Sequence, residues 1–359
     1  MDTTLGPQST DGLPESETTV AQMLQAQGYK TACFGKWHLG HLPAYLPMRR
    51  GFDEYFGTPY SPDMTPFPLL RGADVVEQPA RLDALTAQIT AESVRFIERS
   101  RNSPFFLYVP ETAPHPPQAA SSRFRGKSLC GLYGDMVEEL DWSVGEIMAA
   151  LRKNGLERNT LVFFTSDNGP MNLGSAGPFR GRISSTYEGG VREPYIAWWP
   201  GRIPAGRVND SIVSTLDILP TVARVCGAKA PAPLDGVDLW PVLSGARPAL
   251  ERDVLVYSHR ENIQCARLGR HKLHLSRYGT GAQFVNLPLR PLELYDLARD
   301  PGECYDIAPE HPDVVREIQD RVERLLRGMP ESVRRAWAET QARRTAFYQI
   351  GSPPEPAKQ

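Results

Sequence analysis

The segment Leu161–Gly169 constrains this chain most, because an apolar run leads directly into oxygen-bearing side chains. Its first half has the apolar and aromatic character of a buried strand, and Asp167, Asn168 and Gly169 follow almost at once. In open α/β sheets, ligands bind at the carboxyl ends of the strands, where the loops converge. Carboxylate and amide oxygens suit a hard cation such as Ca²⁺ or Mg²⁺ better than Zn²⁺. The segment predicts a cation site, with an ordinary Asp-Asn-Gly turn as the alternative.

Two other apolar runs are followed by basic side chains. Lys36 and His38 come after the run at 30–34, and residues two apart in an extended chain project to the same side. His115 follows the run at 104–109 and lies between prolines, which restrain the backbone around it. An ammonium group beside an imidazole could hold an anion and exchange a proton with it. The alternative is a solvated lysine and a packed histidine.

The spacing of apolar residues predicts alternating strands and helices. Helical spacing occurs at about 20–26, 83–102, 134–153, 216–225 and 313–328, and strand-like runs occur at 30–34, 104–109, 161–165 and 195–201. This alternation favours an α/β fold with a largely parallel sheet sandwiched by helices. Short strands at 254–257 and 272–275 predict a smaller C-terminal α+β unit with an antiparallel sheet.

These patterns also suggest a domain organisation. We expect a main α/β domain over residues 1–230 and a smaller domain over 231–350. The polar, proline-rich end at 351–359 is expected to be a disordered tail.

Composition excludes several classes of partner and site. The formal net charge is −2 and no extended basic stripe occurs, so a nucleic-acid partner is not expected. No run of 18 apolar residues exists, so the sequence predicts no membrane span. The five cysteines contain no C-x-x-C pair, which favours neither a disulfide framework nor a zinc site.

Six motifs, in order along nearly the whole chain, resemble those of the type I sulfatases of the alkaline-phosphatase-like superfamily, particularly the arylsulfatases. They are Gly35-Lys36-Trp37-His38-Leu39-Gly40, Arg50-Gly51-Phe52-Asp53-Glu54-Tyr55-Phe56-Gly57, Pro59-Tyr60-Ser61, Ala113-Pro114-His115, Thr165-Ser166-Asp167-Asn168-Gly169 and Tyr187-Glu188-Gly189-Gly190-Val191-Arg192. The segments Glu293–Leu297 and Asp300–Glu303 are similar to the family's closing hairpin region. The resemblance implies an alkaline-phosphatase-like fold and metal-dependent hydrolysis of a sulfate ester.

The resemblance also implies catalytic and metal-binding roles. Asp167 and Asn168 would be metal ligands, for Ca²⁺ or Mg²⁺. Lys36 and His38 would hold the sulfate group and assist the hydroxyl of the nucleophile. His115 would protonate the departing oxygen, and the substrate would be a sulfated small molecule or carbohydrate.

Two further residues are implied to bind substrate. Ser61 matches a serine that contacts the sulfate. Many arylsulfatases carry a lysine a few residues before the Thr-Tyr-Glu-Gly-Gly element, and the ungapped position here is Ile183. Arg182 could supply that charge after a small register change, although an arginine reaches differently from a lysine. The alternative is that Arg182 is a surface charge.

Two elements of the family pattern have no counterpart in this sequence. The family's formylglycine nucleophile is made from a Cys/Ser-x-Pro-x-Arg motif, and no cysteine or serine here lies in one. An apolar strand ending in paired aspartates is also missing. Both elements normally lie upstream of this starting point, so we expect an N-terminally truncated sulfatase that is inactive as it stands. A late start site and a genuinely shortened product both remain open, as do the localisation and the oligomeric state.

Two other functions remain alternatives. One is a phosphonate monoester or phosphodiester hydrolase on the same superfamily scaffold. The other is a non-catalytic protein that kept the anion pocket and binds sulfated ligands without turnover.

Overall fold

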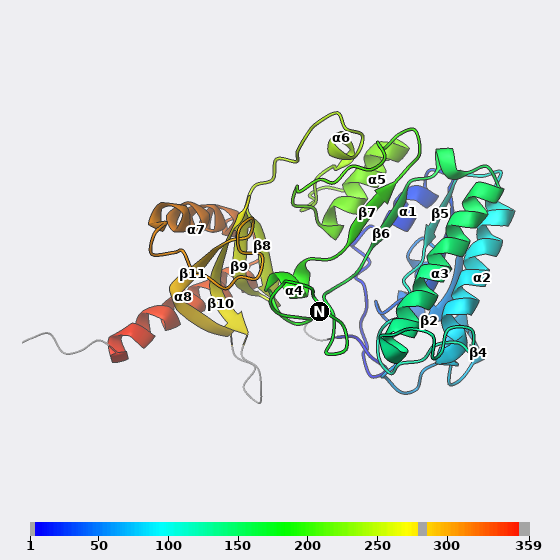
Figure 1. The fold of residues 1–359 in the computed structure, drawn as a ribbon, viewed down its shortest axis with the longest axis horizontal. Helices are drawn as coiled ribbons and strands as arrows, with labels where there is room; N and C mark the ends of the chain where they lie inside the picture. The colour runs from blue at the N-terminus through cyan, green and yellow to red at the C-terminus, as the bar shows by residue number, and fades with distance from the viewer. Residues whose placement is uncertain (1–3, 279–285, 352–359) are drawn as a thin grey trace, which may run out of the picture. The chain divides into compact units, whose positions relative to one another are not determined.

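The computed structural model describes residues 4–278 and 286–351. The chain forms two compact units (Figure 1). One comprises Met1–Phe163 with Ala197–Ala249, and the other comprises Phe164–Ile196 with Leu250–Gln359. The domain boundaries expected at 230 and 350 stay predictions. Of the expected tail, residues 352–359 lie outside the described residues.

The first unit is built on a five-stranded sheet in the order β4-β3-β2-β1-β5. The central strand β1 (Lys30–Lys36) pairs in parallel with β2 (Glu54–Thr58) and β5 (Phe105–Tyr108). The strands β3 (Leu69–Arg71) and β4 (Asp74–Glu77) extend the sheet in antiparallel fashion beyond β2. The largely parallel α/β arrangement is therefore confirmed, with a short antiparallel edge.

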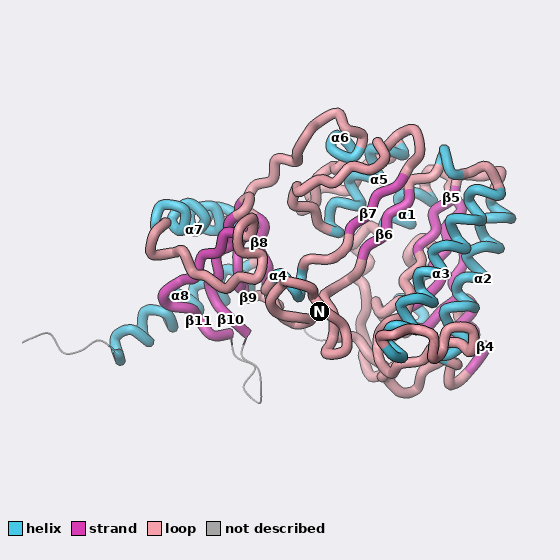
Figure 2. Tube along the Cα trace, viewed as in Figure 1, coloured by secondary structure: helices cyan, strands magenta, loops and turns pink. Residues whose placement is uncertain are grey.

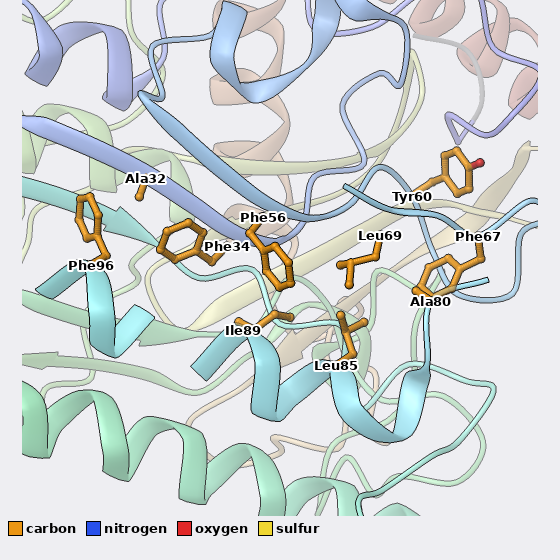
Figure 3. Close-up of a cluster of buried hydrophobic side chains, with 10 residues drawn as sticks. All are labelled: Ala32, Phe34, Phe56, Tyr60, Phe67, Leu69, Ala80, Leu85, Ile89 and Phe96. Carbon is orange, nitrogen blue, oxygen red and sulfur yellow. The ribbon is translucent and has the colours of Figure 1, made fainter. Parts of the chain in front are cut away.

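The central strand is buried on both faces, which explains its nearly continuous apolar sequence. Ala32 and Phe34 lie in a core cluster with residues of helix α2 (Leu82–Ser100), whereas Cys33 lies in a second cluster with Ala21 of α1 (Val20–Gln25). Alternate residues of a strand point to opposite faces. Figure 3 shows the first cluster, in which side chains of the sheet face those of α2.

The remaining helices of the first unit pack against other helices. Helix α3 (Gly131–Lys153) lies beside α2 (Figure 1), and α5 (Ile218–Cys226) contacts α1. The Thr19 side chain accepts a 3.0 Å hydrogen bond from the Gln22 amide and so caps the N-terminus of α1. The short helices are α6 (Trp240–Leu243) and the 3-10 turns Pro43–Tyr45, Pro47–Arg49, Glu157–Asn159 and Thr215–Asp217.

Two strands connect the units along the chain. Strands β6 (Val162–Thr165) and β7 (Tyr195–Trp198) pair with each other in a separate two-stranded sheet. The segment between them belongs to the second unit and includes the short helix α4 (Glu188–Val191).

The second unit contains a four-stranded antiparallel sheet in the order β11-β10-β9-β8 (Figure 2). Its elements are β8 (Leu255–His259), β9 (Asn262–Leu268), β10 (His271–Tyr278), β11 (Asn286–Asp296), α7 (Pro312–Leu326) and α8 (Glu331–Gly351). A core of side chains from this sheet packs against Ile318, Val322 and Leu326 of α7. The expected smaller antiparallel unit is thus confirmed. None of the helices in the described parts of the chain is long and apolar enough to cross a membrane.

Candidate active site

The chain leaving β1 is hydrogen-bonded to the ends of both neighbouring strands. The Lys36 amide donates to the Pro110 carbonyl oxygen, beyond β5, at 2.7 Å. The Trp37 and His38 amides donate to the carbonyl oxygens of Thr58 and Pro59, at the end of β2, at 2.9 and 3.0 Å. Because β1 lies between β2 and β5, the residues after all three strands are held at one sheet edge.

His38 is anchored by its backbone and by its ring. Its φ is +56°, and its Nε2 lies 2.7 Å from the Leu5 carbonyl oxygen. A carbonyl oxygen only accepts, so Nε2 carries the proton. Burial lowers the pKa of His38, the bond to Leu5 opposes this, and the charges of Lys36 and His115 lower the pKa further. The three predicted catalytic residues are therefore electrostatic neighbours.

His115 is presented by the loop that follows β5. Its amide donates to the Thr112 carbonyl oxygen at 3.1 Å, and its Nδ1 lies 2.6 Å from the Pro116 carbonyl oxygen. Nδ1 is therefore the donor in this contact, since the carbonyl oxygen only accepts. This leaves Nε2 as the ring nitrogen that could exchange a proton with a ligand.

Ser61 lies in the segment that follows β2 and is only 4% exposed. Its carbonyl oxygen accepts from the Met64 amide at 3.1 Å, which closes a tight turn. Ser61 therefore lies just beyond the end of β2, two residues after Pro59, whose carbonyl oxygen accepts from the His38 amide. Its contact with a sulfate group stays a prediction.

A buried carboxyl group that the sequence analysis missed precedes His115 by four residues. The Ser143 hydroxyl donates to Glu111 Oε1 at 2.9 Å, while Glu111 Oε2 is buried without a hydrogen-bond partner in the described structure. Burial raises the pKa of Glu111 to about 8, the bond from Ser143 opposes the shift, and the nearby Glu139 adds to it. Glu111 is thus a carboxyl group that is largely protonated near neutral pH.

Asp167 and Asn168 lie in the second unit, directly after β6. Asp167 is exposed and Asn168 is half-buried. The Gly169 amide donates to the Gly190 carbonyl oxygen at 3.1 Å, so the loop rests on helix α4. A side chain at Gly169 would place its Cβ 2.0 Å from the Gly189 carbonyl oxygen, so this close approach requires glycine.

A second carboxyl group near Asp167, that of Glu193, was not singled out in the sequence analysis. Glu193 Oε1 is buried and has no hydrogen-bond partner in the described residues. Burial raises the pKa of Glu193, and the negative charge of Asp167 raises it further. Nearby oxygen donors without a cationic partner are the donor type that Ca²⁺ and Mg²⁺ prefer.

The donor set is nevertheless small. Within residues 4–278 and 286–351, no group of three or more His, Cys, Asp or Glu side chains could hold a metal ion. The side-chain oxygens of Asp167 and Asn168 are of the ligand type that a hard cation prefers. A full shell of six to eight oxygens would need further ligands.

Arg182 is hydrogen-bonded to the loop that follows Asp167 and Asn168. Its Nη1 donates to the carbonyl oxygens of Met171 and Gly174 at 2.9 and 3.1 Å. The Ile183 amide donates to the Pro170 carbonyl oxygen at 3.3 Å. The guanidinium group therefore stabilises this loop through two hydrogen bonds to carbonyl oxygens. Its role in binding substrate stays a prediction.

Comparisons with known proteins agree on one family. The Sulfatase family model matches residues 2–228, and the model for the N-sulphoglucosamine sulphohydrolase C-terminal region matches residues 174–328. The N-acetylgalactosamine-6-sulfatase of Rattus norvegicus is 36% identical over 377 residues, which cover 89% of this chain and 71% of that protein. Arylsulfatase A of Bos taurus is 37% identical over 369 residues, covering 89% of this chain and 73% of that protein.

A solved structure is also similar. It is a protein of a Bacteroides thetaiotaomicron locus for the metabolism of multiple glycosaminoglycans, with a TM-score of 0.80 and 26% identity. The match covers 90% of this chain and 84% of that one.

Proposed function

Because this chain belongs to the sulfatase family of sulfuric ester hydrolases, we propose that Lys36, His38, Ser61 and His115 bind and act on a sulfate ester of a carbohydrate. One observation carries the proposal: these residues follow three adjacent parallel strands at a single sheet edge. The names of the rat relative and of the glycosaminoglycan locus support a sulfated sugar as the substrate class.

Each side chain of the cluster suits one part of the reaction. The Lys36 ammonium group complements the negative oxygens of a sulfate, and the Ser61 hydroxyl can donate a hydrogen bond to them. His115 Nε2 can give a proton to the departing sugar oxygen. His38 has a lowered pKa and its Nε2 proton bonded to Leu5, so its Nδ1 is the ring atom that can accept a proton.

We further propose that Asp167 and Asn168 hold Ca²⁺ or Mg²⁺. A cation bound by these two side chains would supply positive charge to the oxygen atoms of a ligand. Glu193, whose buried Oε1 has no hydrogen-bond partner in the described residues, is an additional candidate for an oxygen ligand.

Residues 1–359 do not include a precursor of the family's formylglycine nucleophile. None of the five cysteines precedes x-Pro-x-Arg, so the residues of this chain do not fit that group. The function proposed for residues 1–359 is therefore recognition of the sulfate ester.

Calorimetric titration with N-acetylgalactosamine 6-sulfate tests this assignment. Lys36→Met should weaken binding at least tenfold, because a charge that faces the sulfate is lost. Lys30→Met is the matched control, since the exposed Lys30 begins the same strand and lies away from the edge that carries Lys36. Equal binding by the wild type and Lys36→Met would refute the assignment.

A further inference from the structure

A buried charge network in the second unit surrounds Glu188, the first residue of helix α4. Glu188 Oε1 lies 2.9 Å from Lys272 Nζ, and Glu188 Oε2 lies 3.2 Å from a guanidinium nitrogen of Arg267. The Glu188 and Lys272 side chains are 1% and 0% exposed. Charges this deep persist only when they are paired, so the contact fixes both side chains firmly.

Glu303 completes the network from the other side. Its Oε2 accepts from the Glu188 amide at 2.6 Å, and its Oε1 lies 3.3 Å from Lys272 Nζ. The same Oε1 accepts from His274 Nε2 at 2.7 Å. Lys272 and His274 are two apart on β10, so both project from the same face of the sheet.

Burial and the neighbouring charges shift the pKa values of Glu303 and His274. Burial would raise the pKa of Glu303, but the bond from His274 and the charge of Lys272 outweigh it and lower the pKa. Burial lowers the pKa of His274, despite its bond to Glu303. The two carboxylates thus face Lys272 and Arg267, and Arg192 Nη1 lies 3.8 Å from Glu188 Oε2 as a third, more exposed cation.

The backbone that Glu188 anchors is the backbone on which the candidate cation loop rests. Gly189 and Gly190 follow Glu188 directly, and the Gly190 carbonyl oxygen accepts from the Gly169 amide. The Gly189 amide donates to the Arg180 carbonyl oxygen at 2.7 Å. The space between these segments is too small for a Cβ at Gly169, at Gly189 or at Gly190. A shift of α4 would therefore move the Asp167–Asn168 loop with it.

We propose that Glu188, clamped by Lys272 and Glu303, is a positioning residue that sets the place of the Asp167–Asn168 loop without touching a ligand. The Tyr-Glu-Gly-Gly and Asp-Pro-Gly-Glu segments then serve one purpose, since they contribute Glu188 and Glu303 to the same clamp. The inference rests on the proposed function only in taking Asp167 and Asn168 as the cation-binding pair.

Hydrogen exchange of the full chain, followed by mass spectrometry, tests the clamp. Glu188→Gln keeps the shape of the side chain and removes its charge. Exchange in peptides covering 166–171 should become at least tenfold faster, while peptides from α7, which contributes no residue to the network, change less than twofold. A uniform change across the unit, or none at 166–171, would overturn the proposal.

Two further variants keep the exchange experiment interpretable if one of the variants does not fold. Lys272→Met removes the cation that both carboxylates share and is expected to loosen the same loop. If it does not fold, the double variant Glu188→Gln/Lys272→Met removes one charge of each sign and should still release the loop. Arg321→Met is the matched control, because it breaks an exposed pair with Asp253 in the same unit, 2.5 Å apart, and should leave 166–171 unchanged.

Calcium alone provides an independent readout. The Ca²⁺ concentration that gives half of the maximal rise in melting temperature should be at least tenfold higher for Glu188→Gln than for the wild type. Saturating Ca²⁺ should still stabilise the variant. An unchanged midpoint would contradict positioning. If the wild type does not respond to Ca²⁺, the cation assignment fails, and the exchange data still decide whether Glu188 positions the loop.

Discussion

The Lys36 amide donates a 2.7 Å hydrogen bond to the Pro110 carbonyl oxygen. This bond joins the end of β1 to the segment after β5, which leads to His115. Two residues that are far apart in sequence, Lys36 and His115, are thereby brought to one edge of the sheet. The charge of each acts on His38 and lowers its pKa.

Gly35 makes this junction possible, so Gly35→Ala should damage both stability and ligand binding. Its φ is +140°, and a Cβ there would lie 2.1 Å from the Pro110 carbonyl oxygen. Forcing the two strand ends apart should cost about 3 kcal/mol of unfolding free energy. Urea unfolding measures the loss, and titration with a sulfated sugar measures the binding.

Gly145→Ala is the comparison for that variant. Gly145 lies on the exposed face of α3, and a Cβ there meets no heavy atom within 4 Å outside its own helix. The substitution should be neutral or stabilising by up to about 1 kcal/mol. Equal effects of the two substitutions would show that the β1–β5 junction is not tightly packed.

The elements predicted correctly from sequence are those with strong apolar periodicity. The expected helices at 83–102 and 134–153 correspond to α2 and α3, and the expected strand at 30–34 corresponds to β1. The β3–β4 hairpin and α8 were not predicted. Exposed Val75 and Val76 interrupt the alternation in β4, and α8 has a weakly amphipathic sequence.

The candidate site shows a similar limit. The histidines and lysine could be found because they follow apolar strands in recognisable motifs. Glu111 and Glu193 could not, because their unusual pKa values arise from burial and from neighbours distant in sequence. Arg182 was singled out from the sequence as a candidate for substrate binding. Its hydrogen bonds to the Met171 and Gly174 carbonyl oxygens could not be predicted from the sequence pattern.

Glu111→Gln should change how stability depends on pH. The pKa of Glu111 rises from an ordinary 4.5 to about 8 in the folded chain. Between these values the unfolded chain is ionised and the folded chain keeps its proton, so wild-type stability falls as the pH rises from 4.5 to 8. The glutamine variant lacks this loss and should be more stable by roughly 2–4 kcal/mol at pH 8.

Thermal unfolding of the two proteins between pH 4.5 and pH 8 measures that difference. The exposed Glu138 on α3 provides the control, and Glu138→Gln should follow the wild type throughout. Parallel curves for Glu111→Gln and the wild type would mean that Glu111 is ionised in the folded chain.

Calcium should stabilise the chain through Asp167. A ligand that binds only the folded state raises the melting temperature with its concentration. Asp167→Ala should abolish the response, whereas Asp83→Ala, which removes an exposed carboxylate from α2, should preserve it. A response that survives in Asp167→Ala would place the cation elsewhere.

Residues 1–359 should not turn over an aryl sulfate at an enzyme-like rate, because no cysteine or serine lies in the motif that yields formylglycine. The assay follows release of the phenol from an aryl sulfate, with His115→Ala alongside. Turnover that is present in the wild type and lost in His115→Ala would show that the chain uses another nucleophile.

The most direct test is to titrate the chain with N-acetylgalactosamine 6-sulfate, its 6-phosphate counterpart and the unsubstituted sugar. The proposed function predicts that the sulfated sugar binds at least tenfold more tightly than both others, and that Lys36→Met removes the preference. Equal affinity for the sulfated and unsubstituted sugars would contradict a sulfate-binding cluster, and preference for the phosphate would support a phosphoester-binding site instead.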